Sequence, residues 1–144
     1  MECCGNNSKL SANGRNVIAL IGHHNVGKSV LFKRLTGRRV TVSNYPGTTV
    51  EVTHGPITGL PEALLLDTPG ILTFPSHTED ERATSQALLE EPLRAILQVG
   101  DAKKLSRTLL LTPQLAELGL PQVLALNMAD EAEAGYDLTA LRPR

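Results

Sequence analysis

Residues 16–29 read NVIALIGHHNVGKS, and this stretch decides the fold of the chain. Residues 16–21 are an apolar run of the length that a buried strand needs, and residues 28–35 carry apolar side chains at helical spacing. Gly37 supplies the signal that ends the helix. The loop between them, from Gly22 to Ser29, has the pattern G-x-x-x-x-G-K-S. The sequence therefore predicts a strand, a tight loop and a helix in direct succession.

This loop has the residues that a phosphate-binding loop requires. Its glycines let successive backbone N–H groups point inward, and the helix N-terminus adds the positive end of its dipole. Lys28 would reach the β- and γ-phosphates of a nucleotide, and Ser29 would offer its hydroxyl to Mg²⁺. The residues that we expect to contact the nucleotide here are Gly22, His23, His24, Asn25, Val26, Gly27, Lys28, Ser29 and Val30.

Short apolar runs and longer amphipathic stretches alternate along the rest of the chain. We expect further strands at residues 48–53, 63–66, 95–99 and 122–126, and further helices at residues 78–90, 103–118 and 137–141. Pro113 should kink the second of these helices, and turns are expected at Gly55-Pro56 and at residues 59–61. This alternation predicts an α/β fold, a mostly parallel sheet with helices on both faces. Such sheets bind ligands outside the carboxyl ends of their strands.

The composition is that of an ordinary globular domain. The 144 residues suffice for one domain, and 41% of them are hydrophobic. No apolar run approaches the roughly 20 residues that a membrane-spanning helix needs. A formal net charge of −1 and an aromatic content of 3% argue against a nucleic-acid partner.

The N-terminal residues carry little structural signal. Residues 1–15 are polar and aperiodic, and we expect them to form a flexible tail. Cys3 and Cys4 are neighbours within it and cannot link distant segments of the chain. This use of cysteine favours a reducing, cytoplasmic setting.

Two further motifs follow predicted buried strands. In Asp67-Thr68-Pro69-Gly70, the Asp67 carboxylate is placed to hold Mg²⁺, and Gly70 lets its backbone N–H approach a γ-phosphate. Asp130 can accept hydrogen bonds from both N1–H and the exocyclic amine of guanine, a donor pair that adenine lacks. Each motif is weak alone, but their positions after successive strands predict a guanine-nucleotide site. The residues expected at its base end are Asn127, Met128 and Asp130.

Together the three motifs resemble, in order and spacing, the GTP-binding domain of Ras-like GTPases. A closer resemblance is to the G domain of bacterial ferrous iron transport protein B (FeoB), and it covers about residues 16–142. The patterns N-[YW]-P-G-x-T-V and L-N-M-x-D-E-A are fairly specific to that family. The segments that carry the resemblance are SNYPGTTV at residues 43–50, DTPG at 67–70, EDER at 79–82, VGDA at 99–102 and ALNMADEA at 125–132.

The resemblance implies hydrolysis of GTP to GDP with Mg²⁺ and K⁺ as cofactors. Thr49 would complete the Mg²⁺ shell of Ser29 and Asp67 when GTP is bound, with Thr48 as the competing candidate. A K⁺ ion held by Asn25 and the carbonyls of Ser43 and Tyr45 would neutralise charge that develops during hydrolysis. The implied catalytic residues are Asn25, Lys28, Thr49 and Gly70.

Two positions depart from the usual GTPase pattern. Ile71 stands where Ras-type enzymes carry a glutamine that orients the attacking water. Because an apolar side chain cannot do this, another group must compensate or hydrolysis must be slow. Met128 replaces the lysine of N-K-x-D, as is expected for this family, and can cover the base with apolar bulk.

We expect residues 16–144 to form a G domain that lacks the last strand, the base-covering loop and the final helix. By the resemblance, the parent protein continues into a helical regulatory domain and a membrane domain that moves Fe²⁺. The chain itself would be soluble and cytoplasmic, within a protein of the bacterial inner membrane. Whether it is a monomer or a strand-exchanged dimer stays open.

Two alternative functions remain. The chain can be a nucleotide-binding module that turns over poorly because the C-terminal part is missing. It can also be a soluble K⁺-dependent GTPase of ribosome or tRNA maturation, although such a protein is expected to carry a basic RNA-binding appendage, which a net charge of −1 does not indicate.

Overall fold

The computed structural model describes residues 16–37, 39–44, 50–71, 82, 85–86 and 92–132. The elements defined within these ranges are strands, α-helices (α) and 3-10 helices (η). In chain order they are β1 (Asn16–Gly22), α1 (Lys28–Thr36), β2 (Thr41–Asn44), β3 (Glu51–Ile57), β4 (Leu60–Asp67), β5 (Leu93–Asp101), η1 (Ala102–Lys104), α3 (Leu105–Ala116), β6 (Gln122–Asn127) and η2 (Ala129–Glu131).

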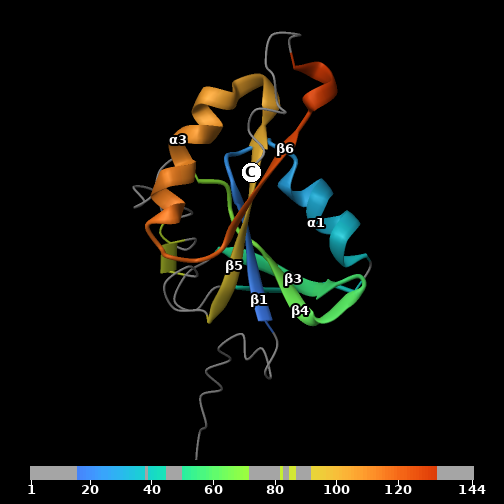
Figure 1. Ribbon diagram of the computed structural model, residues 1–144. Helices are drawn as coiled ribbons and strands as arrows, with labels where there is room; N and C mark the ends of the chain where they lie inside the picture. The colour runs from blue at the N-terminus through green and yellow to red at the C-terminus, as the bar shows by residue number, and fades with distance from the viewer. Residues whose placement is uncertain are drawn as a thin grey trace, which may run out of the picture.

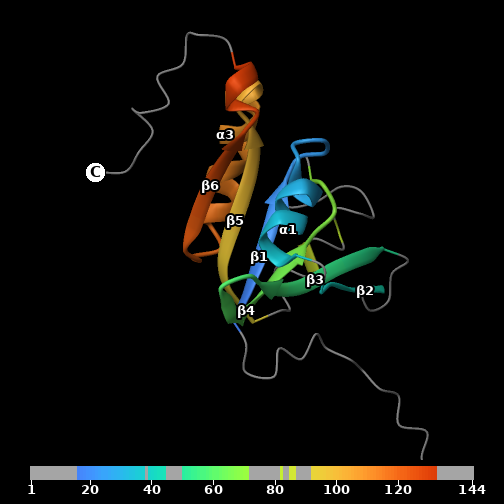
Figure 2. The ribbon, with the colours of Figure 1, turned by 90° about the vertical axis from the view of Figure 1, so that its right-hand side faces the viewer.

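The strands form one sheet in the order β2-β3-β4-β1-β5-β6. β1 is parallel to β4 on one side and to β5 on the other, and β6 is parallel to β5. β3 is antiparallel to both β2 and β4, and these strands extend to one side in Figure 2. In chain order, β2, β3 and β4 lie on one side of β1, and β5 and β6 lie on the other. The carboxyl end of β1 is therefore the switch point at which such sheets bind ligands.

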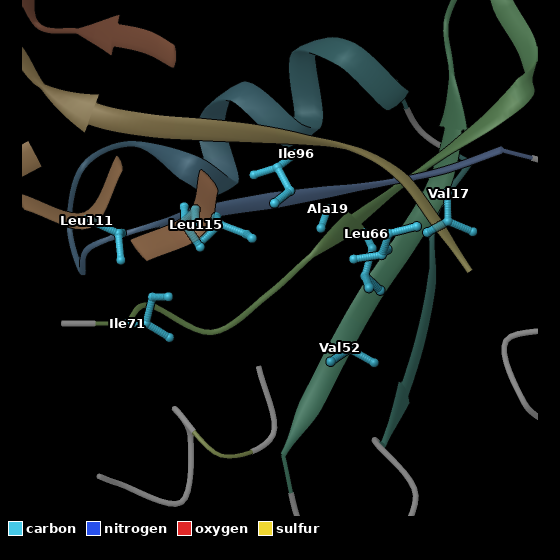
Figure 3. Packing of buried hydrophobic residues seen from close by; sticks show 10 residues of the cluster. Val17, Ala19, Val52, Leu66, Ile71, Ile96, Leu111 and Leu115 are labelled. Atoms are coloured by element: carbon cyan, nitrogen blue, oxygen red, sulfur yellow. The ribbon is translucent and has the colours of Figure 1, made fainter. Parts of the chain in front are cut away.

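Each face of the sheet is covered by a different helix. α1 and α3 lie on opposite sides of the sheet (Figure 1). Side chains alternate along β1, so that Val17 and Ala19 belong to the core beneath α3, whereas Leu20 belongs to the core beneath α1. Leu111 and Leu115 of α3 complete the first of these cores (Figure 3). β1 is thereby buried on both faces, which fits its uninterrupted apolar sequence.

Most predicted elements are confirmed, and their boundaries shift in a consistent way. The four strands expected at residues 16–21, 63–66, 95–99 and 122–126 all run further toward their carboxyl ends, to Gly22, Asp67, Asp101 and Asn127. The first helix ends at Thr36, where the N–H of Gly37 donates to Lys33 O at 3.0 Å. Sheet hydrogen bonding therefore holds the first residue of each motif.

The β2–β4 region differs from the prediction. The turn expected at Gly55-Pro56 is instead part of β3, where these residues pair with Leu65 and Leu64. The register shifts directly after Pro56, a position at which a strand tolerates the missing N–H of proline. The strand expected at residues 48–53 begins at Glu51 in the described chain. β2 was not predicted, because it is short and its mostly exposed residues show no apolar alternation.

The helical predictions are confirmed where the structure describes them. The stretch 103–118 forms η1 and α3, and α3 continues past Pro113 to Ala116. Within 78–90 the described residues are Arg82, Ser85 and Gln86, and all three are helical. The helix expected at 137–141 and the tail at 1–15 lie outside the described residues.

Two neighbouring leucines of α3 test the core. Leu111 is 1% exposed and Leu110 is 70% exposed. We expect Leu111→Ala to lower the free energy of unfolding by about 2–5 kcal/mol, because it leaves a cavity under the helix. Leu110→Ala, the matched control, should change it by less than about 0.5 kcal/mol. Urea unfolding of both variants measures this, and equal effects would contradict the observed helix orientation.

Candidate nucleotide-binding site

The loop between β1 and α1 has a backbone conformation that exposes its N–H groups. Asn25 and Gly27 have φ values of 59° and 90°, in the left-handed region. Turns of this kind form concave nests of N–H groups that bind anions. A Cβ on Gly27 would overlap the side-chain Nδ2 of Asn127, so that only glycine fits. α1 begins directly after the loop, with Leu31 N donating to Gly27 O at 3.0 Å.

Lys28 folds back over the loop that precedes it. Its Nζ donates to Gly22 O at 3.2 Å and to His23 O at 2.8 Å. Burial lowers the pKa of Lys28, and the nearby charge of Asp67 opposes this shift. Since an ammonium group has three N–H donors, the two bonds formed within the described residues leave one for an anionic ligand. Such a ligand would also favour the charged form of the side chain.

Asp67, the last residue of β4, carries a buried oxygen that no other described residue bonds. Its Oδ2 accepts a hydrogen bond from Ser29 Oγ at 3.5 Å, whereas its Oδ1 is buried and has no hydrogen-bond partner among the described residues. Burial raises the pKa of Asp67, against the opposing effects of Lys28 and Ser29. A buried carboxylate oxygen beside a hydroxyl is the type of donor set that Mg²⁺ binds. The residues present therefore fit this ion.

These side chains line one cavity of about 290 Å³ at the carboxyl ends of β1 and β4. Lys28 and Ser29 enter it from α1, and Asp67 and Gly70 enter it from β4 and the segment that follows. His24 and Asn25 contribute from the loop. The structure thus brings together two motifs that are about 40 residues apart in sequence.

The segment after β4 is anchored to the strand that leads into the loop. Thr68 Oγ1 donates to Leu20 O at 2.8 Å, and Ile71 N donates to Gly22 O at 3.1 Å. The side chain of Ile71 is 0% exposed and belongs to the core beneath α3 (Figure 3). Ile71 therefore faces away from the cavity as well as lacking a polar group.

The third motif, which begins at Asn127, contacts the phosphate-binding loop at Val26. Asn127 Nδ2 donates to Val26 O at 3.0 Å, which ties the end of β6 to the loop. Met128 has a φ of 58°, and η2 follows with Asp130 exposed within it. Glu131 of η2 forms a 2.6 Å ion pair with Lys103 of η1. Asn127 thus acts on the loop backbone, a role that the sequence alone did not indicate.

The remaining predicted residues have different positions. Val30 is 57% exposed on α1 and lines a second cavity of about 140 Å³ together with Asn127. Ser43 lies in β2, opposite Val52 of β3, and does not line the cavity of Lys28 and Asp67. Tyr45 and Thr49 lie outside the described residues.

Sequence reasoning missed two side chains of the cavity. Glu51 and Thr53 line it from β3, the strand that is antiparallel to both β2 and β4. The alternation of this segment predicted a strand, but no motif indicated that it would lie beside the loop. Only the pairing of β3 with β4, in which Thr53 is opposite Asp67, brings them there.

Comparison with known proteins identifies the family. The family model described as ferrous iron transport protein B matches residues 16–140. The chain belongs to the FeoB family. The Fe(2+) transporter FeoB of Salmonella typhimurium is 43% identical over 135 residues, which cover 88% of this chain and 18% of the relative. The chain therefore spans less than a fifth of the length of the curated relatives it matches, and within its described residues no helix is long and apolar enough to cross a membrane.

Solved FeoB structures have the same fold. The G domain of T. maritima FeoB is 32% identical with a TM-score of 0.75, over 82% of this chain and 75% of that one. A GDP-bound mutant of the S. thermophilus FeoB G-domain is 39% identical with a TM-score of 0.78, over 83% and 46%. The cytosolic domain of L. pneumophila FeoB is 40% identical with a TM-score of 0.75, over 82% and 53%. The expected Ras-like P-loop GTPase fold is confirmed.

The raised pKa of Asp67 predicts a pH-dependent cost to stability. The folded chain holds the proton of this carboxyl more tightly than the unfolded chain does, so that the free energy of unfolding falls as pH rises from 3.8 through the folded-state pKa. Asp67→Asn should remove this fall and stabilise the ligand-free protein at neutral pH. Urea unfolding at acidic and at neutral pH, without Mg²⁺ or nucleotide, measures the effect.

Asp101→Asn provides the control for this substitution. The Asp101 side chain accepts a hydrogen bond from Lys103 N at 2.9 Å and caps η1. Because the side-chain oxygen of asparagine caps a helix about as well as that of aspartate, this substitution should change stability by less than about 0.5 kcal/mol. If Asp67→Asn lowered stability at neutral pH, burial of the Asp67 charge would not be the cost that the structure indicates.

Proposed function

We propose that this chain binds GTP and GDP and hydrolyses GTP with Mg²⁺, as the G domain that regulates Fe²⁺ transport in a larger FeoB protein. The convergence of Lys28, Ser29 and Asp67 in one cavity carries this proposal. Membership of the FeoB family and similarity to GDP-bound FeoB structures support it. In the parent protein, a helical regulatory domain and a membrane domain for Fe²⁺ would be its partners, at the bacterial inner membrane.

Lys28 and the loop backbone bind the phosphates in this mechanism. The carbonyls of Gly22 and His23 hold Lys28 Nζ over the loop, with one N–H left for the β- and γ-phosphate oxygens. The N–H groups of the left-handed turn and the N-terminus of α1 complete the anion site.

Mg²⁺, when bound, neutralises negative charge on the phosphates as the terminal phosphoryl group is transferred. Ser29 Oγ and Asp67 Oδ1 are the oxygens that would hold it, together with Thr49 of the first switch. Gly70 lines the same cavity, and its backbone N–H is proposed to bind the γ-phosphate. The release of these contacts after hydrolysis would provide the switch.

The buried Ile71 favours a second candidate function, a module that binds nucleotide and turns it over poorly. Its side chain packs in the core and cannot orient the attacking water. Binding of GDP without measurable release of phosphate from GTP would support this module and contradict the GTPase. A GTPase of ribosome or tRNA maturation is disfavoured by membership of the FeoB family.

Asp130 is proposed to select guanine, and a base swap tests this. Asp130→Asn should weaken GDP binding on the order of 100-fold, because an amide cannot accept both donors of guanine. The same variant should gain affinity for xanthosine diphosphate, whose C2 carbonyl accepts a hydrogen bond from the new amide. Isothermal titration with both nucleotides and with ADP measures this.

Glu117→Gln, an exposed substitution at the end of α3, is the control and should bind GDP like the wild type. Equal affinity of the wild-type chain for ADP and GDP would contradict selection of guanine by Asp130.

We further propose that K⁺ stimulates hydrolysis through Asn25. Asn25 lines the cavity, whereas Ser43 lies on β2 and Tyr45 is outside the described residues. Of the residues expected to hold K⁺, Asn25 is therefore the one whose position in the cavity supports this role. Wild-type GTP turnover should be faster in KCl than in NaCl at equal ionic strength, and Asn25→Ala should abolish the difference. K⁺ stimulation that survives in Asn25→Ala would refute this role.

A further inference from the structure

His24 lies where the phosphate-binding loop meets the segment after β4. A Cβ placed on Gly70 would be 2.6 Å from His24 Nδ1 and 2.9 Å from His24 N, so the imidazole covers the open face of Gly70. His24 is exposed, and it lines the cavity that also contains Lys28, Ser29 and Asp67. This contact joins the loop to the residue expected to bind a terminal phosphate.

The two ends of the site are marked by different residues. Asn127 binds Val26 O and lies against Gly27, so the base end of the site is beside these residues. His24 and Gly70 line the cavity of Lys28 and Asp67, and Asn127 does not line it. A nucleotide that places its base near Asn127 and a phosphate at Lys28 therefore directs its next phosphate toward His24 and Gly70.

A hydrogen-bond donor at this end, beyond the Gly70 N–H and Lys28, would further stabilise the third phosphate. This phosphate brings negative charge into a cavity that already contains the Asp67 carboxylate and Glu51. Lys28 has two of its three donors engaged by loop carbonyls, and Ile71 is buried in the core. The ring of His24 has an N–H donor in either neutral tautomer.

We propose that the imidazole of His24 donates a hydrogen bond to the γ-phosphate and so makes the site distinguish GTP from GDP. This inference rests on the proposed nucleotide binding and adds to it the side chain that recognises the third phosphate. His24 also lines a third cavity, of about 240 Å³, on the α3 side of the loop, with Lys104 and Arg107. His24 thus lies between this cavity and that of Lys28 and Asp67, and the proximity of its Nδ1 to Gly70 places the ring beside the latter.

The test compares two ligands on two variants. His24→Ala should bind a non-hydrolysable GTP analogue about tenfold more weakly, the loss expected for one hydrogen bond to a charged group. Its affinity for GDP should stay within about twofold of wild type, because GDP has no third phosphate. His24→Gln should recover part of the affinity for the analogue, since its amide also donates. Isothermal titration in constant Mg²⁺ measures both ligands.

His54→Ala serves as the matched loss of a histidine. His54 lies on β3 but does not line the cavity, and its variant should bind both ligands like the wild type. Equal weakening of GDP and analogue in His24→Ala, or no change in either, would overturn the inference while leaving nucleotide binding intact. A wild-type chain that bound neither ligand would overturn the proposed function and this inference with it.

Discussion

The geometry of the site depends on one constraint, which is that donors from other elements occupy the carbonyl oxygens of the phosphate-binding loop. Gly22 O accepts hydrogen bonds from Lys28 Nζ and from Ile71 N, and Val26 O accepts one from Asn127. These donors belong to α1, to the segment after β4 and to the end of β6. With its carbonyls bound in this way, the loop keeps its N–H groups directed toward the ligand. Three separate parts of the chain therefore define one anion site.

The site costs stability that the rest of the domain must supply. Burial lowers the pKa of Lys28 and raises that of Asp67, which favours the neutral form of each, and Asp67 Oδ1 has no hydrogen-bond partner in the part of the chain that the structure describes. Ligand charge and a divalent ion would relieve these costs, so the site is better satisfied when occupied. The compensating stability comes from the cores on both faces of the sheet, in which Leu20 and Ala19 are fully buried. Packing along the strands thus offsets the cost of burying charged groups at the strand ends.

The sequence was informative where local signals agreed with the tertiary structure. The apolar runs predicted β1, β4, β5 and β6. The signal is strongest in β1, which is buried on both faces and therefore has a continuous apolar sequence. The three motifs were predictable since each follows one of these strands. β2 and the path of β3 through Pro56 were not predicted, because the edge strand β2 and the antiparallel strand β3 beside it carry little burial signal. Glu51 and Thr53 line the cavity because of the path of β3, and no sequence pattern indicated this position.

The sequence by itself determined the alternation of apolar strands with helices and the chemistry available at the ends of those strands. It placed a lysine, a hydroxyl, a carboxylate and a second carboxylate at 28, 29, 67 and 130. Only the tertiary structure decided which atoms are engaged and which are free. Asn127 binds the loop, Ile71 packs in the core, and His24 covers Gly70. These outcomes depend on contacts between residues far apart in the chain, and spacing within a motif carries no information about such contacts.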